Sequence, residues 1–79
     1  MSNTSTTYSP GQKITLRGVD YTVEVVDTVE AVAARGMVNR AAHMRTLGAT
    51  VDVYVRRPRG ATLWRLTEYT NGATSFIPV

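Results

Sequence analysis

Seventy-nine residues, 43% of them hydrophobic, suffice for one domain with one core. The chain has no cysteine, which excludes disulfide bonds and thiolate metal sites, and no apolar run long enough to span a membrane. The net charge is +3 and unevenly distributed: seven arginines and two carboxylates lie after residue 30. This basic part favours an acidic or polyanionic partner.

The first nine residues, MSNTSTTYS, are polar and lack hydrophobic periodicity, which predicts a flexible tail over 1–9 and a single domain over 10–79. Pro10-Gly11 is a turn signal at the start of that domain. The N-terminus lacks the basic and apolar regions of a signal peptide, so a cytoplasmic protein is expected.

Two strands are predicted over 12–17 and 20–26. Gly18 suits the first central position of a type II′ turn, which requires positive φ. The turn Gly18-Val19 would pair Arg17 with Asp20, and would set apolar residues opposite apolar residues along the hairpin.

One long helix is predicted next, over about 28–47. Asp27 is an N-cap candidate with Glu30 at capping-box spacing, and Gly48 is a C-terminal stop. An apolar stripe at steps of three and four runs through the segment and includes Gly36, which would either allow a close approach of the helix to the sheet or be tolerated inside the helix.

Residues 49–79 predict three strands. A type I turn over 57–60, with Pro58 second, would pair Val53 with Trp64 and Asp52 with Arg65. Asn71-Gly72 predicts a type I′ turn. The two registers place one set of residues on a buried face, which the helix is expected to cover: Val51, Val53, Val55, Trp64, Leu66, Ile77 and Val79. The opposite face would carry Tyr54, Arg56, Leu63, Arg65, Thr67, Tyr69, Thr74 and Phe76.

The predicted fold class is α+β. We expect a small, strongly twisted antiparallel sheet or partly open barrel in the order β-β-α-β-β-β, with one helix packed on the sheet. The segment SPGQKITLRGVDYTVEVV (residues 9–26) resembles the first strands of SH3-like small barrels. In size, arginine bias and lack of catalytic groups, the chain also resembles short accessory proteins of high-GC bacteria and their phages, which bind and redirect host proteins.

The first functional hypothesis is nucleic-acid binding, with DNA or RNA as the partner. A hairpin tip over 56–60 would meet phosphates, and aromatic and arginine side chains on the adjoining face would stack on bases. The residues assigned to this role are Arg56, Arg57, Arg59, Arg65, Tyr54 and Tyr69. If the first two strands instead cover that face, as in a small barrel, only the tip remains for nucleic acid.

The second hypothesis is a protein-interaction module that binds a host protein through a sheet edge or a helix surface of small residues. The helix residues assigned to it are Ala31, Ala34, Val38, Ala42 and Arg45. A homodimer through either surface is a third interpretation. The alanines also fit helix propensity alone, without any partner.

No catalytic constellation is present, so the sequence predicts a protein that is not an enzyme and has no small-molecule substrate. His43 is the only histidine, and the six carboxylates are scattered along the chain. Neither a P-loop nor a G-x-G-x-x-G motif occurs. We therefore expect no catalytic residue, no metal site and no cofactor.

Overall fold

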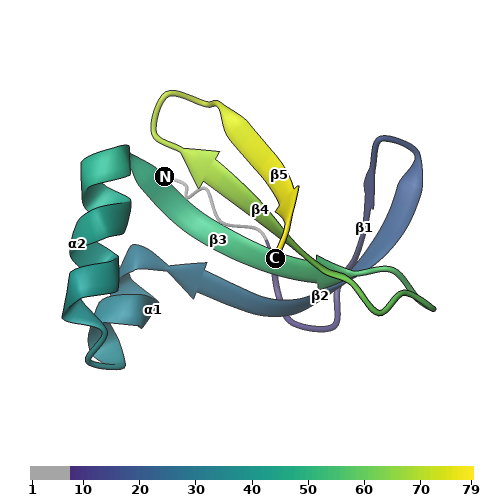
Figure 1. Ribbon diagram of the computed structural model, residues 1–79, viewed down its shortest axis with the longest axis horizontal. Helices are drawn as coiled ribbons and strands as arrows, with labels where there is room; N and C mark the ends of the chain where they lie inside the picture. The colour runs from purple at the N-terminus through teal and green to yellow at the C-terminus, as the bar shows by residue number, and fades with distance from the viewer. Residues whose placement is uncertain (1–7) are drawn as a thin grey trace.

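The computed structural model describes residues 8–79 and shows a small α+β domain (Figure 1). Its strands form one antiparallel sheet in the order β1-β2-β3-β4-β5, which curls into a half-barrel with two short helices at one end (Figure 1). The elements are β1 (Lys13–Leu16), β2 (Val19–Thr28), α1 (Val29–Ala34), α2 (Val38–Leu47), β3 (Ala49–Arg56), β4 (Leu63–Tyr69) and β5 (Thr74–Pro78). The element order is therefore β-β-α-α-β-β-β, with two helices where the sequence predicted one.

The hairpin β1–β2 turns at Arg17-Gly18, one residue earlier than predicted. Both residues have positive φ, 52° and 79°, as a type I′ turn requires. Leu16 therefore pairs with Val19, and the expected Arg17–Asp20 pair does not form. Instead, the Thr15 hydroxyl donates to the Asp20 carboxylate at 2.8 Å. The register differs from the prediction by two residues, so each side chain keeps its face.

The helical segment breaks at Gly36, which corrects the single helix predicted over 28–47. Gly36 has a φ of +83°, a left-handed conformation that ends a helix and that other residues adopt only with strain. The N-cap of α1 is Thr28, whose hydroxyl accepts from the Ala31 N–H at 3.0 Å, and not Asp27. The predicted stop at Gly48 is confirmed, with a φ of 78°.

Strand β3 pairs with β4 two residues away from the predicted register. Val53 lies opposite Leu66, and the loop between the strands runs over 57–62. The tight turn over 57–60 forms within this loop, since the Gly60 N–H donates to the Arg57 carbonyl at 3.0 Å. Again, a shift of two preserves the faces.

Strand β5 differs from its predicted register by one residue, which exchanges its faces. The turn holds three residues, Thr70-Asn71-Gly72. The Gly72 N–H donates to the Tyr69 carbonyl at 3.0 Å, and Gly72 has a φ of 84°. This pattern is a type I turn with a G1 bulge. The shift turns Phe76 inward, whereas Ile77 and Val79, predicted to be buried, are 43% and 68% exposed.

The inner face of the sheet carries Val51, Val53 and Val55, all fully buried. The curl of the sheet covers them. The Phe76 ring on β5 packs edge-on against Tyr21 of β2, with centroids 5.3 Å apart, although two strands separate β5 from β2 in the sheet. The prediction that a helix covers the valines is therefore wrong.

The outer face, which carries Tyr54 and Arg65, receives the helices at one end instead. Arg40 of α2 donates to the Tyr54 hydroxyl at 2.8 Å. A second buried cluster, centred on Val32, Ala41 and Met44, joins the two helices to Ala49 of β3. Strands β1 and β2 do not cover this face, and Tyr54 and Arg65 stay partly exposed.

Tyr8 packs against the inner-face core, and its hydroxyl donates to Glu68 at 2.9 Å. Tyr8, which belongs to the predicted tail over 1–9, therefore contacts the core. The rest of the predicted tail, residues 1–7, lies outside the described residues.

Candidate functional site

Exposed cations gather at one end of the molecule, which we call the turn end. It comprises the Arg17-Gly18 turn and the 57–62 loop, together with the charged residues on the strand segments beside them, Lys13, Asp20, Glu24 and Arg56. The turn and the loop lie far from the helices along the longest axis (Figure 1). Arg17, Arg57 and Arg59 are exposed there, and so is Lys13 on the adjoining edge strand. The sequence prediction named Arg57 and Arg59 but missed Arg17, whose position before a turn glycine was the available signal.

The charge of the protein is concentrated at the turn end. Its charged residues are five cations and two carboxylates: Lys13, Arg17, Arg56, Arg57, Arg59, Asp20 and Glu24. The rest of the chain has four arginines and four carboxylates, which balance. The whole net charge of +3 therefore belongs to this end.

Arg56, predicted to contact nucleic acid, is already engaged within the protein. Its Nε donates to Glu24 at 2.7 Å, and another of its nitrogens donates to the Ala61 carbonyl. The hydrogen bond from Arg56 lowers the pKa of Glu24, and Glu24 in turn raises the pKa of Arg56. A β-bulge at Glu24 places this carboxylate beside Arg56.

Arg57 is exposed but held in place. Its guanidinium lies over the ring of the buried Tyr21, with Cζ 5.9 Å from the ring centroid. Pro58 fixes one backbone angle of the tip, and the hydrogen bond from Gly60 to Arg57 closes the turn. The backbone of the tip and the Arg57 side chain are therefore held in a defined arrangement.

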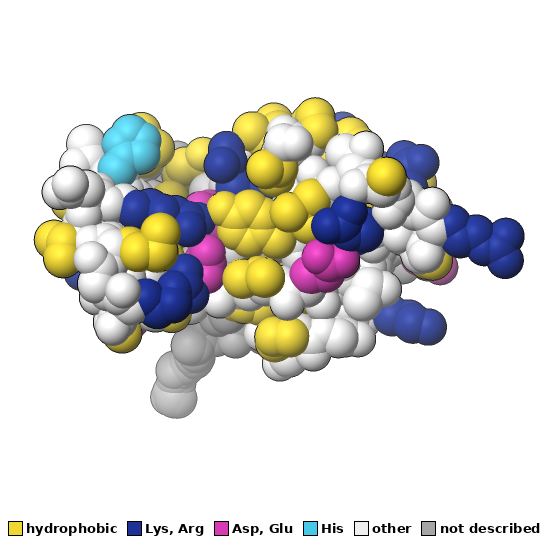
Figure 2. All heavy atoms as spheres, turned by 60° about the horizontal axis from the view of Figure 1, so that its bottom comes forward, with side chains coloured by type: hydrophobic (Ala, Val, Ile, Leu, Met, Phe, Trp, Pro, Cys, Tyr) yellow, Lys and Arg dark blue, Asp and Glu magenta, His cyan; other side chains and the backbone are white. Residues whose placement is uncertain are grey.

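Tyr54, Arg65 and Tyr69, the remaining residues of the nucleic-acid hypothesis, lie on the outer face and away from the tip. Tyr54 and Arg65 are cross-strand neighbours on β3 and β4. On the neighbouring strands, Val25 of β2 lies opposite Tyr54 and Ile77 of β5 lies opposite Arg65, and both aliphatic side chains are exposed. Apolar side chains fill the middle of this face, with basic and acidic ones around them (Figure 2). Aliphatic neighbours offer no ring for base stacking.

A network of two arginines and two aspartates lies beside Tyr54. Asp27 of β2 and Asp52 of β3 face each other across the strands and are only 3% and 7% exposed. Arg40 bridges them, at 3.1 Å from Asp27 and 3.2 Å from Asp52. Arg35 binds the other Asp27 oxygen at 2.9 Å. Sequence reasoning missed this network because it treated Asp27 as a helix cap and paired Asp52 with Arg65.

The network is electrically balanced and fully hydrogen-bonded at Asp52. The Thr67 hydroxyl donates to Asp52 Oδ1 at 2.8 Å, while Arg40 occupies Oδ2. Burial acts to lower the pKa of Arg40, but Tyr54, Asp52 and Asp27 together raise it above its ordinary value. The network thus joins α2 to β2 and β3, and each of its four carboxylate oxygens already has a partner within the protein.

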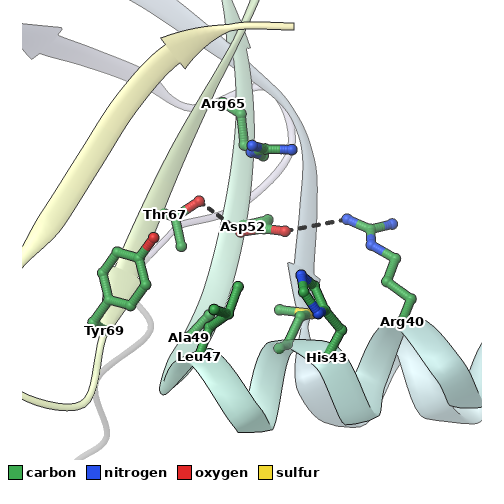
Figure 3. Close-up of a pocket in the computed structure, with 9 residues that line it drawn as sticks. Arg40, His43, Leu47, Ala49, Asp52, Arg65, Thr67 and Tyr69 are labelled. Carbon is green, nitrogen blue, oxygen red and sulfur yellow. Dashed lines mark hydrogen bonds and ion pairs between the residues drawn. The ribbon is translucent and has the colours of Figure 1, made fainter.

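A pocket of about 160 Å³ lies between α2 and the outer face. Arg65 reaches it from β4, His43 and Arg40 from α2, and Tyr69 closes one side (Figure 3). The complete lining is Arg40, His43, Met44, Leu47, Ala49, Asp52, Arg65, Thr67 and Tyr69. It therefore combines donors with an apolar wall.

The helix residues of the protein-interaction hypothesis are divided by the break at Gly36. Ala31 and Ala34 belong to α1, and Ala31 is half-buried. Val38, Ala42 and Arg45 lie on α2 and are exposed, Val38 by 66%. Ala34 of α1 is exposed as well, but the large open apolar side chain of the set is Val38 of α2.

The edge strands are poorly suited to strand addition. The Val79 N–H donates to the Leu63 carbonyl, and the Tyr69 N–H donates to the Ala73 carbonyl. These bonds show which β5 residues direct their backbone groups away from β4, and Pro78 is one of them. Proline cannot donate a hydrogen bond to an added strand. The other edge, β1, is four residues long and carries an outward Lys13.

Within residues 8–79, no three His, Asp or Glu side chains are grouped to hold a metal ion. No helix in the same range is long and apolar enough to cross a membrane. In comparisons with known proteins, no family model, curated protein or solved structure matches the chain.

Proposed function

We propose that the protein binds nucleic acid, DNA or RNA, through the turn end. The observation that supports this most strongly is the separation of charge. Arg17, Arg57 and Arg59 are exposed and make no ion pair among the described residues, whereas Arg35, Arg40 and Arg56 are paired with carboxylates. Away from the turn end, Arg45 is the one other arginine that is exposed without an ion pair within 8–79. As proposed, the protein acts by binding alone, in the cytoplasm, without a catalytic step or a cofactor.

The contacts would be to phosphates. Guanidinium groups bind phosphate oxygens with paired hydrogen bonds, and such contacts position a protein without reading the sequence. Pro58 and the Arg57–Tyr21 contact hold the tip in place, so little conformational entropy would be lost on binding.

The test is a fluorescence-anisotropy titration with single- and double-stranded oligonucleotides over a range of salt concentrations. Binding should weaken steeply with salt, because each phosphate contact releases counterions. Replacing Arg17, Arg57 and Arg59 by Gln should reduce the magnitude of the log–log salt slope by about two to three. Arg45→Gln, which removes a cation from the opposite end of the molecule, is the matched control.

Glu24 offers a second, independent variant. Glu24→Gln removes the carboxylate that holds Arg56 and raises the charge at the turn end by one unit. We expect tighter binding and a steeper salt slope. Equal binding by wild type and the triple Gln variant at low salt would show that the turn end is not the site.

The alternative function is a protein-interaction module, including a homodimer. The observation that favours it is the 66% exposure of Val38, beside Met37 at 42%. Sedimentation velocity and recovery of one stoichiometric host protein, in the presence of nuclease, would test it. Val38→Asp should abolish the interaction and the adjacent Asn39→Asp should not; equal effects would exclude this surface.

A further inference from the structure

Arg65 is a half-buried cation without a partner among the residues that the structure describes. It makes no hydrogen bond or ion pair within 8–79, and its guanidinium extends over the pocket beside α2 (Figure 3). A guanidinium offers five N–H donors. Donors that are partly withdrawn from water and lack an acceptor favour binding of an anion.

The neighbouring carboxylates do not satisfy this charge. Both oxygens of Asp52 are occupied, by Thr67 and Arg40, and both oxygens of Asp27 are occupied, by Arg35 and Arg40. Two arginines neutralise these two aspartates, and Arg65 is one positive charge in excess. The other titratable groups facing the pocket, His43 and Tyr69, are further donors without partners in the described chain.

The remaining wall of the pocket is apolar. Met44, Leu47 and Ala49 form it, with Met44 and Ala49 buried and Leu47 56% exposed. A fully hydrated inorganic anion would gain nothing from this wall. A volume of about 160 Å³ is also smaller than the 300–1,000 Å³ typical of sites for whole drug-sized ligands.

We propose that this pocket binds a carboxylate carried on a short aliphatic stem. The carboxylate accepts from Arg65, with His43 or Tyr69 as a second donor, and the stem lies against Leu47 and Met44. The group belongs either to a free monocarboxylate or to an acidic side chain of a peptide. The sequence alone predicted no small-molecule partner, because the lining comes from α2, β3 and β4 and only the fold brings it together.

The probe is butyrate, followed by ¹H–¹⁵N NMR of the intact chain. We expect saturable shifts at Arg65, Ala49 and Thr67 with a Kd of about millimolar, which six heavy atoms can supply. Butyramide keeps the stem without the charge, and inorganic phosphate keeps a charge without the stem. Both should bind at least about tenfold more weakly, since a charged hydrogen bond or a buried stem is lost.

Arg65→Gln should weaken butyrate binding about tenfold or more, and Leu47→Gln should weaken it several-fold. Peaks away from the substitution that keep their wild-type positions in the ¹H–¹⁵N spectrum confirm that each variant is folded. Arg45→Gln is the matched control and should leave the affinity unchanged. A blocked Gly-Glu-Gly peptide, compared with Gly-Gln-Gly, distinguishes a peptide carboxylate from a free monocarboxylate. If the Glu peptide binds more tightly than butyrate, the site is assigned to a peptide carboxylate. If butyrate binds more tightly, the site is assigned to a free acid. Three results would each overturn the proposal. They are the absence of NMR shifts at the pocket with either carboxylate, phosphate binding as tight as that of butyrate, and butyrate binding that Arg65→Gln leaves unchanged. None of these outcomes bears on nucleic-acid binding at the turn end.

Discussion

Arg40→Gln removes the one cation that bridges Asp27 and Asp52, and we expect it to destabilise the fold strongly. The two carboxylates lie opposite each other and are 3% and 7% exposed. Removing one partner of a buried ion pair typically costs about 3–5 kcal/mol. The lower end applies here, because Arg35 still holds Asp27 and the Arg40 side chain itself is 30% exposed. We therefore expect a loss of about 3 kcal/mol at neutral pH.

Urea denaturation followed by the fluorescence of Trp64, the only tryptophan, measures the free energy of unfolding at pH 7. For a domain of this size, about 3 kcal/mol corresponds to a fall in Tm of about 12–24 °C. Arg45→Gln, an exposed change on the same helix, should remain within about 0.5 kcal/mol of wild type. An Arg40→Gln deficit below about 1 kcal/mol at pH 7 would refute the reasoning from the network.

Tyr8 should titrate near pH 12 in the folded protein, because burial and then Glu68 raise its pKa from 10.0 to about 12; its contribution to stability is therefore present below pH 10 and lost as the pH rises towards 12. An absorbance titration of wild type against Tyr8→Phe checks this expectation. A normal titration of all four tyrosines would contradict it. Arg17→Asn should stabilise the β1–β2 hairpin by about 0.5–1 kcal/mol, since Asn adopts positive φ more readily than Arg. Thermal unfolding should therefore show a higher Tm, and an unchanged or lower Tm would mean that the turn is not type I′. Gly36→Ala should cost about 1–2 kcal/mol in urea denaturation and Gly36→Asn less, because the added Cβ meets open space and only the φ of +83° opposes it.

The strand registers show how far local turn chemistry predicts a sheet. In β1–β2 and β3–β4 the predicted registers were wrong by two residues, and the buried valines were still assigned to the correct face. In β4–β5 an error of one residue exchanged Phe76 with Ile77. The Asn-Gly signal could not distinguish a two-residue turn from a three-residue turn. Long-range packing favours the latter, because Phe76 then stacks on Trp64 at 5.0 Å and contacts Tyr21.

The sequence predicted which arginines of the candidate sites are exposed better than it predicted which of them are paired. The exposure of Arg57 and Arg59 was predicted, because a proline-containing turn is exposed in any register. The engagement of Arg56 by Glu24 was not predictable, since it depends on a β-bulge that no turn or hydrophobic pattern reports. The partnerless state of Arg65 was also missed, because the two-residue error in β3–β4 placed Asp52 opposite Arg65 and not opposite Thr67.

The break at Gly36 explains why the outer face has both a neutral network and an unpaired arginine. In one continuous helix starting after Thr28, Arg40 would lie about 18 Å along the axis from the helix start, out of reach of Asp27. In the structure the chain reverses after Gly36, and Arg40 comes within 3.1 Å of Asp27 and 3.2 Å of Asp52. Arg40 thereby occupies Asp52 Oδ2, and Arg65 makes no ion pair among residues 8–79. The left-handed glycine thus sets the position of α2 and of Arg40, and it is Arg65, not Arg40, that we propose binds an external carboxylate.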